Sequence, residues 1–415
     1  MIDIQFIREN PEVVQKTADD KNVVVDVARF LELDRKRLAT QQELEQLRSE
    51  RNEISSQNSG TRPSEQAMKR GKELKEAIDT KAKELEEFMG EYSELYMSIP
   101  NMISEDTPIG GEENNEVVAT VGDVQKSGAT DHLEWLLDRK LVDFERAAKV
   151  SGSKFYYSMG DLASLEMAVM QYALSVCEDH GFTRVMVPNM VHERIMEGTG
   201  FLPRGEEKQI YQIDGQDLQL IATSEIPLTG LHSDEVLDLS DGPILYAGFS
   251  PCYRLEAGAY GKHERGLYRN HQFYKVEMYA YCEPKDSVEL HEKIRAVEEE
   301  IFQALHIPYQ VVINASADLG APAYKKYDIE YYSAVDGEFR ELSSCSNVTD
   351  YQARRCNIKY KNPETGKLEF VHTLNGTAMV SSRGPIAIIE NNQTEDSSVR
   401  VPEVLQKFMN KEVMG

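Results

Sequence analysis

Apolar side chains recur at helical spacing in two long segments near the start of the chain. From residue 27 to residue 57 there is no glycine or proline, and strong helix formers are frequent. A second helical pattern starts at Ser64 and runs to about residue 97. The apolar face carries Leu31, Leu38, Leu44, Leu47 and Ile54 in the first segment and Met68, Leu74, Ile78, Leu85, Phe88 and Leu95 in the second.

These two patterns predict an antiparallel helical hairpin, an arm over about residues 27–97. The sequence between them, Asn58-Ser-Gly-Thr-Arg-Pro63, has the composition of a tight turn. Each helix would be about 45 Å long for roughly 30 residues. The apolar stripe is narrow, which favours a two-stranded coil over a helix buried inside a domain.

Breaker residues separate this region from a second kind of pattern. We expect residues 1–100 to form an N-terminal domain, 101–130 a linker and 131–415 a larger domain. In the larger domain Asp161 is expected to cap a helix that closes at Gly181. Short β-rich segments dominate the rest: VMVPNMV, QIYQI, LQLIAT, ILYAGF, HQFYKVEMYAYC, YQVVI and YDIEYYSA. Because they lack regular alternation with helices, they predict an α+β domain with an antiparallel sheet flanked by helices.

Composition excludes several classes of protein. No apolar stretch approaches the ~20 residues of a membrane span, and the N-terminus lacks the layout of an export signal. The five cysteines are scattered, without the spacing of a zinc site, so we expect reduced thiols in a cytoplasmic protein with no zinc. The net charge of -25, from 46 basic and 71 acidic side chains, argues against a polyanionic partner if the charge is evenly spread.

The charge is not evenly spread. Residues 29–83, within the expected arm, contain 13 basic and 10 acidic side chains, whereas the rest of the chain contains 33 and 61. Around the expected turn, residues 48–72 contain six basic and three acidic side chains. A nucleic acid would therefore be tolerated mainly along the distal half of the arm.

The densest polar segment is YRLEAGAYGKHERGLYRNHQFYKVE, residues 253–277, which reads as strand, loop and strand. Arg254 and Glu256 would share one face of the first strand, and Arg269, Phe273 and Glu277 one face of the second. Arginines for phosphates, a ring for a base and a carboxylate for an amine would suit a nucleotide. A solvated hairpin with cross-strand ion pairs is the alternative. The loop carries Gly258, Gly261, Lys262, His263, Arg265 and Gly266.

Arg383 marks a second candidate site. It lies between a strand-like stretch and an apolar, helix-like segment, and Gly384-Pro385 follow it. A helix N-terminus favours anions, so Arg383 could hold a terminal phosphate. A surface arginine at an ordinary turn would give the same pattern.

Two further clusters offer oxygen and hydroxyl groups. In FRELSSCSN, Glu341 with Ser343 and Ser344 would suit Mg²⁺, although a hydroxyl-rich strand end is the simpler reading. Glu341 and Ser344 have opposite strand parity, so joint contact with a metal requires a bulge or the end of the strand. In LIATSEIPL, Thr223 and Glu225 could hold a small zwitterion, or form an ordinary hydroxyl turn or helix cap.

Taken in order along the chain, these segments resemble the seryl-tRNA synthetases of the bacterial type, which are class II aminoacyl-tRNA synthetases. The resemblance rests on MIDIQFIREN and the hairpin, followed by AAKVSGSKFYY, GTGFLPRGEEKQIYQI, ATSEIPL, the segment over 253–277, RELSSCSN, YQARR and TLNGTAMV. It implies a six- or seven-stranded antiparallel sheet flanked by helices, an arm that binds tRNA(Ser), and a homodimer formed through the helix after Asp161 and the strand VMVPNM.

The resemblance also implies an activity and residue roles. The chain would activate L-serine with ATP and Mg²⁺ and transfer it to tRNA(Ser), and also to tRNA(Sec) where that tRNA is present. Arg254 would hold the α-phosphate, Arg383 the γ-phosphate, Phe273 the adenine ring and Glu256 its amine. The implied ATP site comprises Arg254, Leu255, Glu256, Asn270, Phe273, Glu341, Leu342, Ser343, Ser344 and Arg383, with Glu341 and Ser344 at Mg²⁺. The implied serine site comprises Thr223, Ser224, Glu225, Arg254, Glu277, Asn375 and Thr377, and Arg254, Glu256 and Arg383 would be catalytic.

Two positions depart from the family pattern. Ala222 replaces a common proline, and Gly384-Pro385 replace larger residues after Arg383, which leaves open where that helix begins. Two other functions stay open. One is a paralogue that loads an amino acid onto a carrier protein, although such proteins generally lack a long arm with a basic tip. The other is a binding paralogue with an inactive site.

Overall fold

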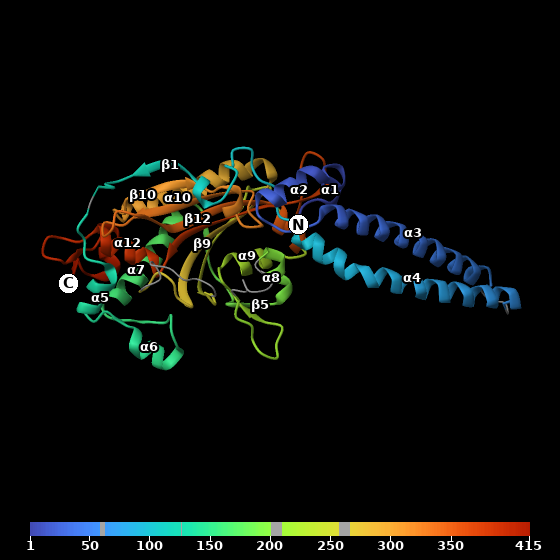
Figure 1. Cartoon of the computed structure of the whole chain (residues 1–415), viewed down its shortest axis with the longest axis horizontal. Helices are drawn as coiled ribbons and strands as arrows, with labels where there is room; N and C mark the ends of the chain where they lie inside the picture. Colours follow the sequence, from blue (N-terminus) through green and yellow to red (C-terminus); the bar gives the residue numbers. More distant parts are fainter. Residues whose placement is uncertain (59–62, 126, 201–209, 257–265) are drawn as a thin grey trace. The chain divides into compact units, whose positions relative to one another are not determined.

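The computed structural model describes residues 1–58, 63–125, 127–200, 210–256 and 266–415. The chain divides into two compact units, residues 1–102 and 103–415 (Figure 1). The expected turn tip at residues 59–62, the block at 201–209 and the loop at 257–265 lie outside the described residues. No helix within the described ranges is both long enough and apolar enough to cross a bilayer.

The first unit consists of helices. Two short ones, α1 (Ile4–Glu9) and α2 (Pro11–Asp20), precede the long α3 (Val27–Gln57) and α4 (Glu65–Ser98). Asp26 caps α3 by accepting from the Arg29 amide, and Ser64 caps α4 by accepting from the Ala67 amide. The predicted boundaries of the hairpin helices therefore agree with the structure to within a few residues.

Cross-helix contacts fix the hairpin's antiparallel register. Phe30 stacks on Tyr92 and Tyr96, with ring centroids 5.2 Å apart in each pair. Three ion pairs join α3 to α4: Arg29–Glu91, Glu43–Lys81 and Glu50–Arg70. The partner in α4 comes earlier as the residue in α3 comes later, which is the register of an antiparallel pair. The apolar stripe is less continuous than its spacing suggested, because Leu38 is 44% exposed and Met68 is 50% exposed.

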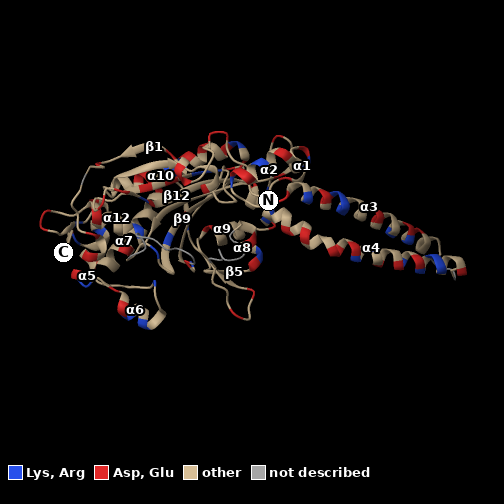
Figure 2. Cartoon of the chain, in the orientation of Figure 1, with Lys and Arg blue, Asp and Glu red and all other residues tan. Residues whose placement is uncertain are grey.

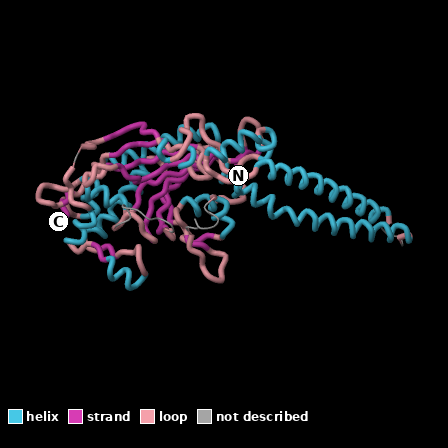
Figure 3. Tube along the Cα trace, viewed as in Figure 1, coloured by secondary structure: helices cyan, strands magenta, loops and turns pink. Residues whose placement is uncertain are grey.

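An eight-stranded sheet organises the second unit, in the order β1-β10-β11-β12-β15-β9-β8-β4 (Figure 3). Its neighbours pair antiparallel except for the edge pair β4–β8, which is parallel. The strands are β1 (Glu116–Val121), β4 (Thr183–Met186), β8 (Ile244–Tyr253), β9 (Gln272–Cys282), β10 (Tyr309–Ile313), β11 (Lys325–Tyr332), β12 (Phe339–Thr349) and β15 (His372–Val380). The predicted antiparallel architecture is confirmed, but the sheet has eight strands where the resemblance implied six or seven, with β1 and the parallel β4 at its two edges. Strand β1 forms an edge of this sheet, so part of the expected linker at 101–130 belongs to the larger unit.

Helices and short strands complete this unit. The helices are α5 (His132–Asp138), α6 (Phe144–Ser151), α7 (Asp161–Asp179), α8 (Glu193–Thr199), α9 (Glu225–Leu231), α10 (Ser287–Ala304), α11 (Tyr351–Cys356), α12 (Arg383–Asn391) and α13 (Glu403–Met409), with 3₁₀ turns at Glu112–Asn114, Pro284–Asp286 and Ser316–Asp318. The short strands are β2 (Val142–Asp143), β3 (Tyr157–Ser158), β5 (Met190–Val191), β6 (Gln219–Leu220), β7 (Val236–Leu237), β13 (Lys359–Lys361), β14 (Leu368–Phe370), β16 (Val399–Arg400) and β17 (Val413–Met414).

The main hydrophobic core lies on one face of the sheet. It includes Val276 and Met278 of β9, which pack with apolar residues of α7, α10 and α12. The intervening residues Phe273, Lys275 and Glu277 point to the opposite face, because strand side chains alternate. That opposite face carries the candidate site. One local expectation was wrong: α7 has Gly160 at its N-cap, and Asp161 is its first helical residue, ion-paired with Lys411.

Candidate active site

The strand pair β8–β9 brings the first group of candidate residues together. Cys252 pairs with Phe273 in the ladder, so Arg254 follows one position beyond the pairing. Its guanidinium carbon lies 5.3 Å from the centre of the Phe273 ring. The Arg254 amide donates to the carbonyl of His271 at 3.0 Å, and His271 Nδ1 lies 3.0 Å from the Arg254 carbonyl. These two contacts hold the arginine where the strands part.

Glu256 does not continue the face of Arg254 as the pattern predicted. Strand β8 ends at Tyr253, and Glu256 has a left-handed backbone with φ of +47°. Its carbonyl accepts from Lys154 Nζ at 3.1 Å, and its carboxylate pairs with Arg269 Nη1 at 3.0 Å. Arg269 lies outside β9, so its predicted alignment with Phe273 and Glu277 on one strand was wrong as well. Phe273 and Glu277 do share a strand face.

A bulge in β12 resolves the parity of Glu341 and Ser344. Opposite β11, Glu341 pairs with Glu330 and Ser343 with Ile329, so Leu342 is the extra residue. Ser344 then pairs with Asp328, which lies two residues from Glu330 on the same face. Glu341 and Ser344 therefore face the site side by side, as joint contact with a metal requires.

Leu342 and Ser343 turn away from that face. Leu342 is buried in the main core, and Ser343 Oγ donates to Glu298 of α10 at 3.3 Å. Asn270 is also turned inward, since its amide donates to the Leu267 carbonyl. The half-buried Leu255 has no polar side chain to offer. Any contact of Leu255, Asn270, Leu342 and Ser343 with ATP would therefore come from their main-chain atoms.

Arg383 is the first residue of α12, so the departure at Gly384-Pro385 does not displace the helix from it. Proline is tolerated in a first helical turn, and a Cβ at Gly384 would collide with the Met379 thioether, which explains the small residue. Arg383 Nη1 lies 3.0 Å from Glu341 Oε2 and 3.2 Å from the Glu341 carbonyl. Its guanidinium lies 4.8 Å from the centre of the Tyr268 ring.

Glu341 is strongly acidic in this setting. Burial by itself would raise the pKa of its carboxyl, but Arg383, Lys326 and Arg254 together lower that pKa to about 2. Arg383 contacts this carboxylate directly, and Arg254 lies within electrostatic range of it. An ionised carboxylate beside a hydroxyl fits a hard cation such as Mg²⁺.

Beside this region is a second, buried group. Glu225, the first residue of α9, accepts from Gln352 Nε2 at 2.7 Å and from Asn375 Nδ2 at 3.1 Å, both on Oε1. Burial, reinforced by the charge of Glu277, raises the pKa of Glu225 to about 7, although Gln352, Lys275 and Arg254 oppose the shift. Asn375, expected near the pair that reads the hydroxyl, lies two residues before Thr377 on β15 and donates to Glu225.

The hydroxyl groups of Thr223 and Ser224 have different partners. Thr223 Oγ1 accepts from the Glu225 amide at 3.2 Å, which is the hydroxyl turn considered as its alternative reading. Ser224 Oγ lies 2.7 Å from Ser250 Oγ beneath strand β8, so its hydroxyl is directed into the fold. Thr223 and Glu225 therefore lie together at the start of α9.

Glu277 and Thr377 face each other across the β9–β15 ladder. Thr377 Oγ1 donates to Glu277 Oε2 at 3.2 Å, and Lys275 Nζ forms an ion pair with the same oxygen. Sequence reasoning missed Lys275, Gln352, Tyr268 and His271. Lys275 carried a usable signal, because it shares strand parity with Phe273 and Glu277; the others become visible only through contacts between distant segments.

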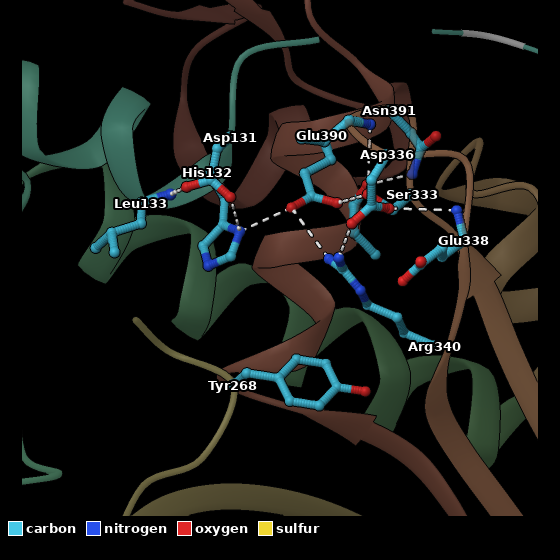
Figure 4. Close-up of polar contacts among 12 residues, drawn as sticks. Asp131, His132, Leu133, Tyr268, Ser333, Asp336, Glu338, Arg340, Glu390 and Asn391 are labelled. Atoms are coloured by element: carbon cyan, nitrogen blue, oxygen red, sulfur yellow. Dashed lines mark hydrogen bonds and ion pairs between the residues drawn. The ribbon is translucent and has the colours of Figure 1, made fainter. Parts of the chain in front are cut away.

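A separate polar cluster supports α12 (Figure 4). Its members Asp131, His132 and Glu390 have potential metal-ligand atoms within 4.8 Å of one another. However, the Glu390 carboxylate already lies 2.7 Å from His132 Nδ1 and accepts from Ser333 Oγ at 2.6 Å, and Arg340 Nη1 is 3.9 Å away. Both oxygens of the Glu390 carboxylate are therefore already engaged by protein groups, which accounts for the cluster without a metal. The cluster joins α5 to the helix that begins with Arg383.

Comparison with known proteins identifies the family of the chain. Residues 1–103 match the family model of the seryl-tRNA synthetase N-terminal domain, and residues 209–392 match the tRNA synthetase class II core domain (G, H, P, S and T). The serine–tRNA ligase of Dictyoglomus turgidum is 46% identical over 99% of this chain and 98% of its own length.

Solved structures agree as well. The seryl-tRNA synthetase of Pyrococcus horikoshii complexed with ATP is 37% identical, with a TM-score of 0.91 over 100% of this chain and 99% of that one. The cytoplasmic serine–tRNA ligase of Naegleria fowleri in complex with AMP is 32% identical, with a TM-score of 0.86 over 100% and 98%. The chain belongs to the seryl-tRNA synthetase family.

Proposed function

We propose that this protein is a serine–tRNA ligase, which uses ATP to form seryl-adenylate and then transfers serine to the 3′ end of tRNA(Ser), and of tRNA(Sec) where that tRNA is present. The observation that carries the proposal is the buried cluster of Glu225, Glu277 and Thr377, within electrostatic range of Arg254. It offers a carboxylate for an ammonium group and a carboxylate–hydroxyl pair for a hydroxyl, beside an arginine for a phosphate.

In the proposed ATP site, Arg254 holds the α-phosphate and Arg383 the γ-phosphate. Phe273 stacks on adenine, and Glu256 accepts from its exocyclic amine. The electrostatic influence of Arg254 and Arg383 on Glu341 supports this, since both cations act on one carboxylate. The main chain at Leu255, Asn270, Leu342 and Ser343 would complete the site.

Glu341 and Ser344 would hold Mg²⁺, which when bound neutralises charge on the phosphate oxygens. The bulge at Leu342 supports this assignment because it places both oxygen donors on one face. Glu341 already pairs with Arg383, so phosphate oxygens near Arg383 would also be near Glu341.

In the serine site, Thr223 and Glu225 would bind the ammonium group, with Asn375 supporting Glu225. Glu277 and Thr377 would read the hydroxyl. The Glu225 contacts of Gln352 and Asn375 both fall on Oε1, which directs Oε2 toward a ligand. A site that hydrogen-bonds the hydroxyl rejects alanine and glycine because its own polar groups would be left unpaired, whereas threonine must be excluded by size.

The first step then needs no protein base. The serine carboxylate is ionised at neutral pH and attacks the α-phosphorus in line, and pyrophosphate leaves. The protein contributes orientation and charge neutralisation through Arg254 and Arg383. In the second step a ribose hydroxyl at the tRNA 3′ end attacks the carbonyl carbon of the adenylate, and AMP leaves.

The two units would divide this work. Residues 1–100, with the arm at about 27–97, would bind tRNA, and residues 131–415 would carry the catalysis. A homodimer through α7 and the strand after it is supported by exposed apolar side chains there: Met167 is 71% exposed and Met186 is 73% exposed. We place the protein in the cytoplasm, where its substrates ATP and tRNA occur; its five cysteines are all free thiols.

The decisive test is Arg254→Ala. Because this guanidinium would neutralise the phosphate under attack, we expect the variant to lose serine-dependent ATP–pyrophosphate exchange. Exchange retained at the wild-type rate would remove Arg254 from the site. Charging of tRNA with serine and with threonine by the wild-type protein separates a tRNA ligase from a paralogue that loads a carrier protein or has no activity.

A further inference from the structure

Lys275 is a buried cation at the centre of the proposed serine site. It lies on β9 between Phe273 and Glu277, on the face that carries the site, and it is only 6% exposed. A lysine loses favourable hydration when it is buried, so its position requires a compensating partner. Its ammonium group finds that partner in Glu277.

The contacts of Lys275 form a closed triangle. Its Nζ is ion-paired with Glu277 Oε2 and lies 3.5 Å from Thr377 Oγ1. Thr377 Oγ1 in turn donates to Glu277 Oε2 at 3.2 Å. A hydroxyl has one hydrogen, so when that hydrogen is directed at Glu277 the lone pairs of Thr377 face Lys275. The triangle thereby fixes the direction of every hydrogen bond in it.

Carboxyl groups lie near Glu277 on both faces of the sheet, Glu225 on the site face and Glu298 on the core face with α10. Glu225 on α9 and Glu298 on α10 both respond to the charge of Glu277: burial with that charge raises the pKa of Glu225 to about 7 and the pKa of Glu298 well above its ordinary value. The cations acting on Glu225 are Lys275 and Arg254. Of these two, Lys275 is the one in contact with the Glu277 carboxylate.

We propose that Lys275 is a positioning residue that sets the specificity of this site for the serine hydroxyl. It engages Oε2 of Glu277 directly and through Thr377, which leaves Oε1 directed at the ligand as a hydrogen-bond acceptor. This inference rests on the proposed function and names the residue that makes its hydroxyl-reading carboxylate selective.

The site then has one hydrogen-bond acceptor for the substrate side chain, Oε1 of Glu277. A substrate hydroxyl donates to Oε1, whereas a hydrogen atom or methyl group in its place leaves a buried carboxylate oxygen unpaired. Without the lysine, Glu277 is free to rotate, and its charge lacks a contacting cation. Discrimination between serine and alanine should therefore depend on Lys275 more than binding of the adenylate part does.

The test compares two ligands that differ by one hydroxyl, seryl- and alanyl-sulfamoyl-adenosine. Binding of each to the full-length wild type and to Lys275→Met is measured by calorimetry. We expect the variant to bind the seryl compound roughly 10- to 100-fold more weakly, the worth of a hydrogen bond to a charged group, while affinity for the alanyl compound changes by less than about threefold. Equal losses for both ligands would overturn the proposal, because a merely structural lysine would affect both.

Three further variants sharpen the outcome. Lys275→Arg keeps the charge and should restore most of the seryl preference; a preference no better than that of Lys275→Met would count against the charge. Lys275→Gln gives the same test if circular dichroism shows that the methionine variant is unfolded. Lys325→Met is the matched control, since Lys325 is another largely buried lysine paired with a carboxylate, 2.6 Å from Asp106 and outside the proposed site, and its loss should leave the seryl preference intact.

Failure of the proposed function would look different. In that case the wild type itself would show no preference for the seryl compound. A wild-type preference that survives in Lys275→Met would contradict only the role of the lysine.

Discussion

At the scale of single residues, the site depends on which oxygen of each carboxylate is bonded to other protein groups. Glu225 takes both of its amide contacts on Oε1, and Glu277 takes its lysine and hydroxyl contacts on Oε2. In both residues the protein saturates one oxygen and orients the other. Burial keeps these contacts strong but also makes ionisation of Glu225 harder.

The raised pKa of Glu225 predicts a pH dependence of serine binding. The carboxyl must be ionised to attract an ammonium group, and with a pKa of about 7 it loses its charge as the pH falls through that value. Between about pH 8 and about pH 6 the ionised fraction drops roughly tenfold, and we expect KM for serine to rise by about that factor. The measurement is ATP–pyrophosphate exchange across this range with ATP varied separately.

The ATP dependence serves as the internal reference for that measurement. Glu225 lies in the serine pocket, so KM for ATP should change much less than KM for serine. If Glu225→Gln keeps the same pH profile for serine, another group is responsible.

At the scale of elements, the packing of α10 on the sheet requires a glycine in β15. A Cβ at Gly376 would overlap the Ile294 side chain and lie 2.9 Å from Glu298 Oε1, both on α10, and 3.1 Å from the Cβ of Cys345 on β12. Such an approach allows the helix to lie tightly on β15, the strand that carries Asn375 and Thr377. Sequence pattern predicted both elements but not this close approach.

Gly376→Ala is therefore expected to lower the free energy of unfolding by about 1–3 kcal/mol, because the interface would be overpacked. The melting temperature should fall accordingly. Gly90→Ala is the matched control: Gly90 is exposed inside α4, and a Cβ there meets nothing within 4 Å. It should stabilise the protein by about 0.5–1 kcal/mol through better helix propensity. The measurement is the melting temperature of both variants, and equal shifts in melting temperature would contradict the tight packing at Gly376.

At the scale of the whole molecule, the uneven charge limits where tRNA can bind. The net charge is -25, yet both signs alternate along α3 and α4 (Figure 2). Arg48 and Arg51 are exposed near the end of α3. Binding to phosphates releases condensed counterions, so binding through such residues weakens as salt increases.

Arg48→Ala combined with Arg51→Ala should lower kcat/KM for tRNA charging by roughly tenfold. The slope of log(kcat/KM) against log(salt) should become shallower by about one for each phosphate that the variant no longer neutralises. Serine-dependent ATP–pyrophosphate exchange should stay unchanged. Arg146→Ala, which removes an exposed arginine on α6, is the control. Charging and exchange that respond alike to salt would contradict a tRNA-binding arm.

The sequence by itself determined the parts. Helical spacing predicted α3 and α4 nearly to their ends, because helix patterns and caps depend on residues that are close in the chain. Charged and aromatic residues in the strand-like segments pointed to Arg254, Phe273, Glu277 and Glu341. Local patterns could not foresee that Glu256 leaves the strand, or that β1 joins the sheet from a breaker-rich stretch.

Tertiary structure decided how those parts meet. The bulge that turns Glu341 and Ser344 to one face exists only through the register of β12 on β11. Gln352 reaches Glu225 from a segment 127 residues away, and Lys275 acquires its role from Thr377 on a neighbouring strand. Strand register and buried ion pairs depend on packing between residues far apart in the sequence, whereas helical periodicity depends on residues that are close in the sequence.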